Sequence, residues 1–306
     1  MSTRSVVVVG SCNVDLVATA PRHPQPGETI LGDTLRTFPG GKGANQALAA
    51  ARAGVPVHLI GRVGPDAGAQ LLRDSLTADG VDLTWLGTCK HDPTGTALIV
   101  VSSAGENTIV VVPGANGLLR DVHVGDAVDA GILGDAGALL VQLEIPMPAV
   151  ARACRAARDA GVTVICNAAP AAVLPPEVLS DVDVLVVNEH ELGIVTGTTG
   201  SGVEAGIRAA LEVVPAVVLT LGSRGALLAT DHERVEVAAH SVDVVDTTAA
   251  GDAFCGTFAA AIASGTTVAD ALRRANAAGA IACTAEGAQP SLPTAAQVDE
   301  LLTRQG

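Results

Sequence analysis

The sequence has very few aromatic residues, with three Phe, one Trp and no Tyr among its 306 residues. Proteins that bind single-stranded nucleic acid usually stack the bases on aromatic rings, so this class is not favoured. Basic residues are also scarce: 18 Lys and Arg stand against 32 Asp and Glu, which gives a net charge of −14. Such a charge repels nucleic acids and anionic membranes, and we expect neither as a partner.

Cysteine motifs and long apolar runs are missing as well. The six cysteines are scattered without C-x-x-C spacing, which argues against a zinc or redox motif and favours reduced thiols in a cytoplasmic protein. The longest stretches without a charged residue span 17 residues, at 160–176 and 253–269. Both contain Gly or Pro and fall short of the roughly 20 apolar residues of a membrane span. The apolar run Val6–Val9 is too short for a signal peptide.

What the sequence does have is a large supply of small aliphatic residues, with 48% of the chain hydrophobic. Short β-branched runs that suit buried parallel strands recur at Val6–Val9, Val57–Ile60, Leu139–Val141, Val162–Ile165, Val184–Val187 and Val217–Leu219. Ala-rich segments with helical spacing occur at Ala44–Ala53, Ala67–Ala78, Ala149–Ala160, Gly202–Val213, Ala253–Ala263 and Val268–Ala282. This alternation predicts one doubly wound α/β domain over residues 1–306, with a mostly parallel sheet and helices on both faces.

Two segments, at about 14–38 and 95–112, interrupt the alternation. The first is rich in Pro and Gly, and the second has two strand-like runs around a turn-rich centre, which is typical of a hairpin. They predict a small antiparallel sheet that acts as a lid over a site. We expect an uncovered face of this sheet, with Leu98, Val100 and Ile109 among its residues, to pair with a second copy in a homodimer.

A first motif, Gly40-Gly41-Lys42-Gly43-Ala44-Asn45-Gln46, leads into a predicted helix. Its glycines predict close approach of the backbone to a ligand, and Lys42 and Asn45 add side-chain donors. The motif lacks the glycine spacing and the Ser or Thr of a P-loop. The alternative is an ordinary Gly-rich turn.

A second motif, Asp246-Thr247-Thr248-Ala249-Ala250-Gly251-Asp252-Ala253-Phe254, precedes another predicted helix. Its small residues leave the amides of the helix start open to an anion, and Asp252 can take a proton beside that anion. These features favour phosphoryl transfer to an alcohol. In the alternative interpretation, Asp252 only caps the helix.

Together the two motifs resemble the signatures of the ribokinase-like (PfkB) carbohydrate kinase family, and the likeness extends over essentially the whole chain. Accessory segments that carry it are Ser11–Asp15, Gly114–Asn116, Gln142–Glu144, Thr220–Gly225 and Gly287–Ser291. The resemblance implies ATP-dependent phosphorylation of a sugar, with D-ribose and its 5-hydroxyl as the first expectation. Alternatives are a family kinase for deoxyribose, fructose or adenosine, or a sugar-binding regulator without catalysis.

The resemblance also implies roles for individual residues. It assigns the sugar to Asn13, Asp15, Gly41, Lys42, Gly43, Asn45 and Glu144. It assigns catalysis to Asp252 as base, with Gly251, Ala250 and Ala249 beside it. It assigns the nucleotide to Thr220, Leu221, Gly222, Ser223, Arg224, Gly225, Gly251 and Asn276. It implies that Asn188 and Glu191 organise Mg²⁺ and the phosphates, and that K⁺ binds at Asp246, Thr248, Ala282, Ala285, Gly287 and Ser291.

Structural roles without a ligand stay open for several of these residues. Asp15 and Asp246 suit turns, Asn188 with Glu191 suits a helix capping box, and Asn276 suits a buried amide. Ser223 and Arg224 suit a solvated turn. Because aromatic residues are rare, we expect an aliphatic lining around the adenine.

Overall fold

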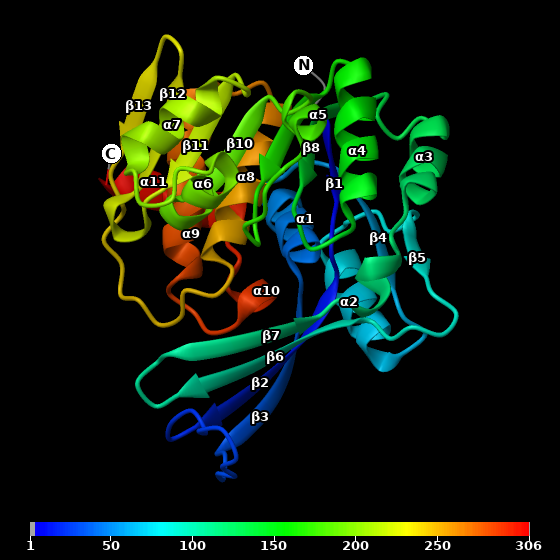
Figure 1. Cartoon of the computed structure of the whole chain (residues 1–306), viewed down its shortest axis with the longest axis vertical. Helices are drawn as coiled ribbons and strands as arrows, with labels where there is room; N and C mark the ends of the chain where they lie inside the picture. The colour runs from blue at the N-terminus through cyan, green and yellow to red at the C-terminus, as the bar shows by residue number, and fades with distance from the viewer. Residues whose placement is uncertain (1–3, 306) are drawn as a thin grey trace.

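The computed structural model describes residues 4–305, and in this range nine strands form one large sheet (Figure 1). In spatial order they are β13 (Arg234–Val237), β12 (Ala226–Thr230), β11 (Ala216–Thr220), β10 (Val184–Asn188), β9 (Thr163–Asn167), β8 (Ala136–Val141), β1 (Ser5–Val9), β4 (Val57–Val63) and β5 (Leu86–Thr88). Neighbouring strands from β5 to β11 run parallel, and β12 and β13 add an antiparallel edge.

Helices cover both faces of this sheet, which explains why its strands are apolar without interruption. In β1, Val6 and Val8 pack into one hydrophobic core and Val7 and Val9 into the other. The first core includes α1 (Lys42–Arg52), α2 (Ala67–Ala78), α8 (Ala250–Ala263), α9 (Val268–Ala282) and α11 (Ala295–Gln305). The second includes α3 (Asp121–Asp129), α4 (Met147–Asp159), α5 (Pro176–Leu179), α6 (Glu189–Thr196) and α7 (Val203–Leu211).

The predicted doubly wound α/β architecture is confirmed, and each predicted apolar run lies mainly or wholly in a strand of the large sheet. Three helices begin earlier than predicted, α1 at Lys42, α4 at Met147 and α8 at Ala250. Gly41 precedes α1, and Gly251 lies in the first turn of α8. Because glycine is a poor helix former, it conceals a helix start from a pattern search.

Small residues bring α1 and α8 close together. A Cβ on Gly256 of α8 would lie 2.4 Å from the main-chain oxygen of Gln46 and 2.6 Å from the Cβ of Ala49. Glycine is therefore required at this crossing. The close approach allows polar side chains at the start of α1 to reach the first turn of α8.

A second, four-stranded sheet, called the lid sheet below, projects from one side of the body (Figure 1). Its order is β3 (Thr34–Gly40), β2 (Asn13–Ala20), β6 (Gly95–Ser102) and β7 (Asn107–Val112). The outer pairs are antiparallel as predicted, but the central pair, β2 with β6, is parallel. The prediction of an antiparallel sheet is wrong for this pair because both strands leave the body at the same point, with Asn13 opposite Gly95.

The lid sheet has exposed apolar side chains on both faces. Register pairs Leu98 with Val110, whereas Ile109 pairs with Ile99 and shares the face of Asp15. The expectation that Ile109 lies on the same face as Leu98 is therefore wrong, since adjacent residues of a strand point to opposite faces. The sequence predicts the hairpin, but the face on which each residue lies depends on the strand register, which the sequence pattern does not show.

Three short helical segments complete the described chain: η1 (Gly114–Leu118), η2 (Gly222–Arg224) and α10 (Ala288–Ser291). Among residues 4–305, no helix is both long and apolar enough to cross a membrane.

Candidate active site

Two cavities meet at the start of α8, where the body faces the base of the lid sheet. The smaller, of about 240 Å³, is lined by Lys42, Asn167, Asn188, Glu191, Asp252 and Cys255 among others. The larger, of about 610 Å³, is lined by Thr220, Gly222, Ser223, Gly225, Phe254 and Asn276 among others. Gly251, Thr220 and Thr247 line both. The first turn of α8 thus separates a small polar cavity from a larger and more apolar one.

Asp252 lies in the first turn of α8 with its carboxylate between two amides. Asn45 Nδ2 donates to Asp252 Oδ2 at 2.9 Å, and Gln46 Nε2 donates to Oδ1 at 2.9 Å. The N-cap position belongs to Ala249, so the interpretation of Asp252 as a simple helix cap is wrong. The side chain is instead fixed from α1, as a reacting carboxylate must be.

The backbone around Gly251 is open toward both cavities. The first intrahelical bond runs from Ala253 N to Ala249 O, so the N–H groups of Gly251 and Asp252 lie at the free end of the helix. An added Cβ on Gly251 would meet nothing within 4 Å. Ala249 holds the turn in the left-handed conformation at φ 60°, an uncommon one for a residue other than glycine. This geometry leaves room for an anion at a helix N-terminus.

Polar groups from β2 and from the end of β8 face the same region. Asn13 and Asp15 are the first and third residues of β2, so they share one face of the strand. Asn116 Nδ2 donates to Asn13 Oδ1 at 2.7 Å and thereby orients it. Glu144 Oε2 accepts from Ser11 Oγ at 2.5 Å, from the Lys42 main-chain N at 3.2 Å and from Asn13 Nδ2 at 3.5 Å.

Acidic side chains outnumber basic ones in this region. Burial raises the pKa of Asp15, and together with the smaller effect of the Glu144 and Asp252 charges it brings this pKa to about 7. Burial lowers the pKa of Lys42, but the carboxylates of Asp252, Glu144 and Glu191 outweigh burial and leave that pKa above its usual value. Lys42 is therefore a charged ammonium ion surrounded by acidic groups, an arrangement able to bind a ligand with many hydroxyls.

The glycines of the first motif have a packing role that the sequence did not predict. Added Cβ atoms would lie 2.6 Å from Asn13 N at Gly41, and 2.5 Å from the Gly10 carbonyl carbon and Ser11 N at Gly43. Gly41 also has φ 90°. These glycines allow the turn to pack on the chain's own backbone between β1 and β2. This packing requires glycine at both positions, and the approach of a ligand to the same backbone stays a prediction.

The predicted nucleotide residues divide into two groups. Thr220, Gly222, Ser223, Gly225 and Asn276 line the larger cavity, and Asn276 is also held by a 2.8 Å bond to the Ala238 carbonyl oxygen. Leu221 packs against the core, and Arg224 forms an exposed ion pair with Glu189 at 2.5 Å. For the Arg224 side chain, the solvated-turn interpretation is the one that the structure supports.

The lining of the larger cavity is not purely aliphatic. Phe254, one of the three Phe residues, lines it together with Val242, Val244 and Ala280. The expectation of an aliphatic lining is therefore wrong in this one respect. Phe254 follows Asp252 by two residues, so the helix that carries the carboxylate also carries the ring.

Asn188 and Glu191 form the capping box that the sequence left as an alternative. Asn188 Oδ1 accepts from Glu191 N, and Glu191 Oε2 accepts from Asn188 N, each at 2.8 Å. Both residues also line the smaller cavity. Capping therefore fixes two oxygen-bearing side chains beside Asp252.

The predicted cation-binding residues lie on two adjoining loops. Asp246 Oδ1 accepts from Thr248 N and Oγ1, and Asp246 Oδ2 accepts from Gly287 N at 2.9 Å. Although burial raises the pKa of Asp246, these hydrogen bonds bring it below its usual value. Asp246 therefore caps its own turn and joins it to the loop before α10. Ala282 ends α9, Ala285 follows it, and Ser291 ends α10.

Sequence reasoning missed the amide network behind Asp252 and the support of Asn13. The network consists of Gln46, Gln142 and Asn167, and Asn116 supports Asn13. Gln46 was visible in the first motif, next to Asn45. Its role was not, because helical spacing does not show which neighbouring helix a side chain meets.

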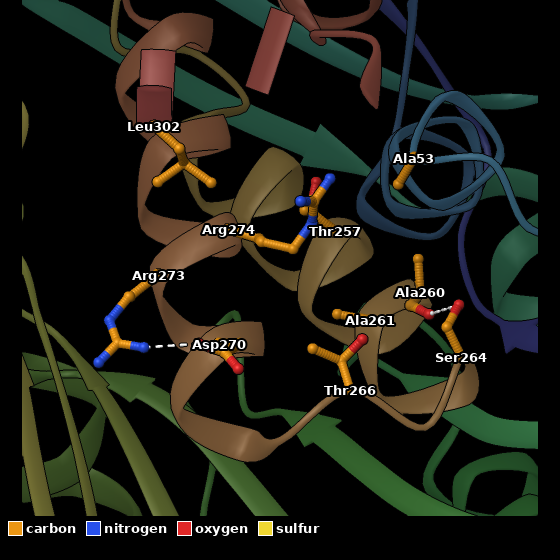
Figure 2. Close-up of a pocket in the computed structure, with 10 residues that line it drawn as sticks. All are labelled: Ala53, Thr257, Ala260, Ala261, Ser264, Thr266, Asp270, Arg273, Arg274 and Leu302. Atoms are coloured by element: carbon orange, nitrogen blue, oxygen red, sulfur yellow. Dashed lines mark hydrogen bonds and ion pairs between the residues drawn. The ribbon is translucent and has the colours of Figure 1, made fainter. Parts of the chain in front are cut away.

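A third cavity, of about 550 Å³, lies at the opposite end of α8 (Figure 2). It is lined by Thr257, Ser264, Thr266 and two arginines among others. Arg273 is paired with Asp270 and Arg274 with Asp299, so both positive charges are already neutralised. Asp252 and the amide end of α8 lie far along the helix from it, so the first two cavities are the candidate active site.

Comparisons with known proteins show the family to which the chain belongs. The family model "pfkB family carbohydrate kinase" matches residues 3–295. The chain is 38% identical over 301 residues to a ribokinase of Bacillus subtilis (strain 168), covering 98% of this chain and 100% of that protein.

Two solved structures extend the likeness to three dimensions. Arabidopsis thaliana ribokinase complexed with ribose and ATP has a TM-score of 0.90 at 35% identity, covering 98% of this chain and 99% of that chain. Ribokinase from Cryptococcus neoformans var. grubii serotype A in complex with ADP has a TM-score of 0.81 at 33% identity, covering 97% of this chain and 99% of that chain. The chain therefore belongs to the pfkB family, and it is an ATP-dependent carbohydrate kinase.

Proposed function

We propose that the chain transfers the γ-phosphoryl group of ATP to the 5-hydroxyl of D-ribose, giving D-ribose 5-phosphate and ADP. The observation that carries the proposal is the Asp252 carboxylate, held by Asn45 and Gln46 between the open amides of α8 and the polar residues of β2. The names of the Bacillus and Arabidopsis relatives support ribose as the substrate.

In this proposal the sugar lies between the lid sheet and α1. Asn13, Asp15, Glu144 and the Lys42 ammonium ion bind its secondary hydroxyls. Asn45 adds an acceptor, since its Oδ1 atom is buried and has no hydrogen-bond partner among the described residues, while its Nδ2 atom is engaged by Asp252. The 5-hydroxyl then points at Asp252.

The chemical step uses the groups at the start of α8. Asp252 accepts the proton of the 5-hydroxyl as its oxygen forms a bond to the γ-phosphorus and the bond from that phosphorus to the ADP oxygen breaks. The open amides of Gly251 and Asp252, which follow Ala249 and Ala250 in this turn, donate to the charged oxygens of the transferring group. The adenosine part of ATP occupies the larger cavity, against Phe254 and the segment Thr220–Gly225.

Mg²⁺ fits the smaller cavity, because Asn188 and Glu191 present oxygen atoms there and the ion prefers oxygen ligands. When bound with ATP, the ion neutralises charge on the phosphates. The capping box of Asn188 and Glu191 keeps both side chains in place before the nucleotide arrives.

We also propose a K⁺ site at Asp246, Thr248, Ala282, Ala285, Gly287 and Ser291. The hydrogen bond from Gly287 N to Asp246 supports it, because it joins the two loops that would contribute oxygens. K⁺ there would stabilise the turn that positions the α8 amides. Replacing K⁺ by Na⁺ at constant Mg²⁺ should lower kcat, and Asp246→Ala should lower activity and abolish the ion dependence. Equal rates with and without K⁺ would refute this site.

A homodimer through the lid sheet is proposed on the exposed apolar face opposite Asp15. Leu98, Val110 and Val112 lie on it with exposed fractions of 46%, 57% and 47%, and Leu35 of β3 lies there with 71%. A sheet face of this composition is usually covered. Val110→Asp should convert a dimer to a monomer in sedimentation experiments, and a wild-type monomer at micromolar concentration would refute the proposal.

The competing functions are a kinase for another sugar or nucleoside and a regulator without catalysis. ADP release should be measured with ATP, Mg²⁺ and D-ribose, 2-deoxy-D-ribose, D-fructose or adenosine in turn. The proposal predicts the highest kcat/KM with D-ribose. A higher value with another acceptor would reassign the substrate, and sugar binding without ADP release would favour the regulator.

A further inference from the structure

The side chain of Gln46 joins three elements behind the active site. It is fully buried, with 0% exposure, and it extends from α1 toward α8 and the end of β9. Its Nε2 atom donates to Asp252 Oδ1 at 2.9 Å and to Asn167 Oδ1 at 3.0 Å. Gln46 therefore contacts the carboxylate through a fully buried amide.

The orientation of this amide is fixed by a second glutamine. Gln142, directly after β8, donates from Nε2 to Gln46 Oε1 at 2.6 Å. Because the oxygen of Gln46 is occupied by a donor, its nitrogen must face Asp252 and Asn167. Gln142 is itself fully buried, with Gly10 leaving the space for its amide.

We propose that Gln46 is a positioning residue for the proton-accepting carboxylate of Asp252, with Gln142 fixing its direction. The inference rests on the proposed role of Asp252 as base. Asn45 holds Oδ2 and Gln46 holds Oδ1, so the plane of the carboxylate is determined by two adjacent residues of one helix. Gln46 donates only to groups of the protein, so its contribution is to the direction and charge of Asp252 rather than to sugar binding.

The charged surroundings make this donor important. The ionisable groups that face Asp252 from the packed elements are Lys42 of α1, Asp15 of β2, Glu144 after β8, Glu191 of α6 and Cys255 of α8. Only Lys42 among them carries a positive charge. A hydrogen bond donated to Oδ1 stabilises the ionised form of Asp252 against its acidic neighbours.

The test replaces Gln46 with Met, which has a similar shape and no donor. We expect Gln46→Met to lower kcat by about 10–100-fold and to change the KM for sugar by less than about threefold. The acidic limb of the pH profile of kcat should move to higher pH by about one unit, since a hydrogen bond to a charged group is of that strength. Gln142→Met should shift both quantities in the same direction by a smaller amount.

Leu48→Val is the matched control, because Leu48 is a fully buried residue of the same helix without a polar contact to Asp252. It should leave the acidic limb and kcat unchanged. A Gln46→Met enzyme with the wild-type profile, or a Leu48→Val enzyme with the same shift, would overturn the inference.

Asp252→Asn distinguishes the positioning role of Gln46 from the proposed role of Asp252 as base. If Asp252→Asn is inactive while Gln46→Met is normal, the positioning role alone is refuted. If Asp252→Asn keeps wild-type turnover, the proposed base assignment is refuted as well.

Discussion

Gly251 offers a sharp test of where the phosphoryl group binds, because a methyl group added there would meet no atom of another element. Apart from its chain neighbours and the nearby backbone of its own helix, no heavy atom lies within 4 Å of the Cβ position, and the residue does not have a left-handed φ. Gly251→Ala therefore introduces no steric conflict in the free protein. Because Gly251 lines both cavities, we expect the added methyl group to narrow the space beside this helix end.

The expected effects on stability and activity have opposite signs. Alanine is a better helix former than glycine, so the variant should gain up to about 0.5–1 kcal/mol in free energy of unfolding. The methyl group should keep the γ-phosphoryl group away from the α8 amides. Loss of such contacts typically costs about 10²–10³-fold in kcat.

Gly43→Ala is the matched comparison, since its Cβ would lie 2.5 Å from the main chain of Gly10 and Ser11. Overpacking there should cost about 1–3 kcal/mol of stability. Thermal unfolding and steady-state ADP release should be measured on both variants. A Gly251→Ala enzyme with turnover within threefold of wild type would show that the phosphoryl group does not bind at this helix end.

Two further predictions concern stability. The pKa of Asp15 is raised from 3.8 to about 7, so ionisation of this group destabilises the fold progressively as pH rises from about 4 to 7. Asp15→Asn should therefore raise the free energy of unfolding by up to about 4 kcal/mol at pH 8 and by little at pH 4. The same variant should raise the KM for sugar. Equal gains in stability at both pH values would contradict the raised pKa of Asp15. Ala249→Gly should raise Tm by about 2 °C by relieving the left-handed φ of 60°, and an unchanged or lower Tm would contradict the strain.

The body of the fold was predictable because its signals are local. A run such as Val6–Val9 can be buried on both sides only in a parallel sheet covered by helices, and the Ala-rich segments supply those helices. The second motif likewise carries its chemistry within a few residues, from Asp246 to Asp252. A local sequence pattern is sufficient to predict candidate residues when they all lie at the start of one helix.

Contacts between distant segments were not predictable in the same way. The hydrogen bond from Gln46 to Asp252 joins residues 206 positions apart, and it exists because Gly256 lets two helices approach. The parallel pairing of β2 with β6 and the face on which Ile109 lies depend on register, which no local pattern records. The same limit hid the packing of Gly41 and Gly43 on the backbone between β1 and β2.

The most direct test of the central claim compares ADP release by the wild type and by Asp252→Asn with D-ribose, ATP and Mg²⁺. The wild type should form ribose 5-phosphate. The variant should lose about 10²–10⁴-fold in kcat while its affinity for the sugar, measured by calorimetry, changes much less. Near-wild-type turnover by the variant, or no ribose-dependent ADP release by the wild type, would contradict the account.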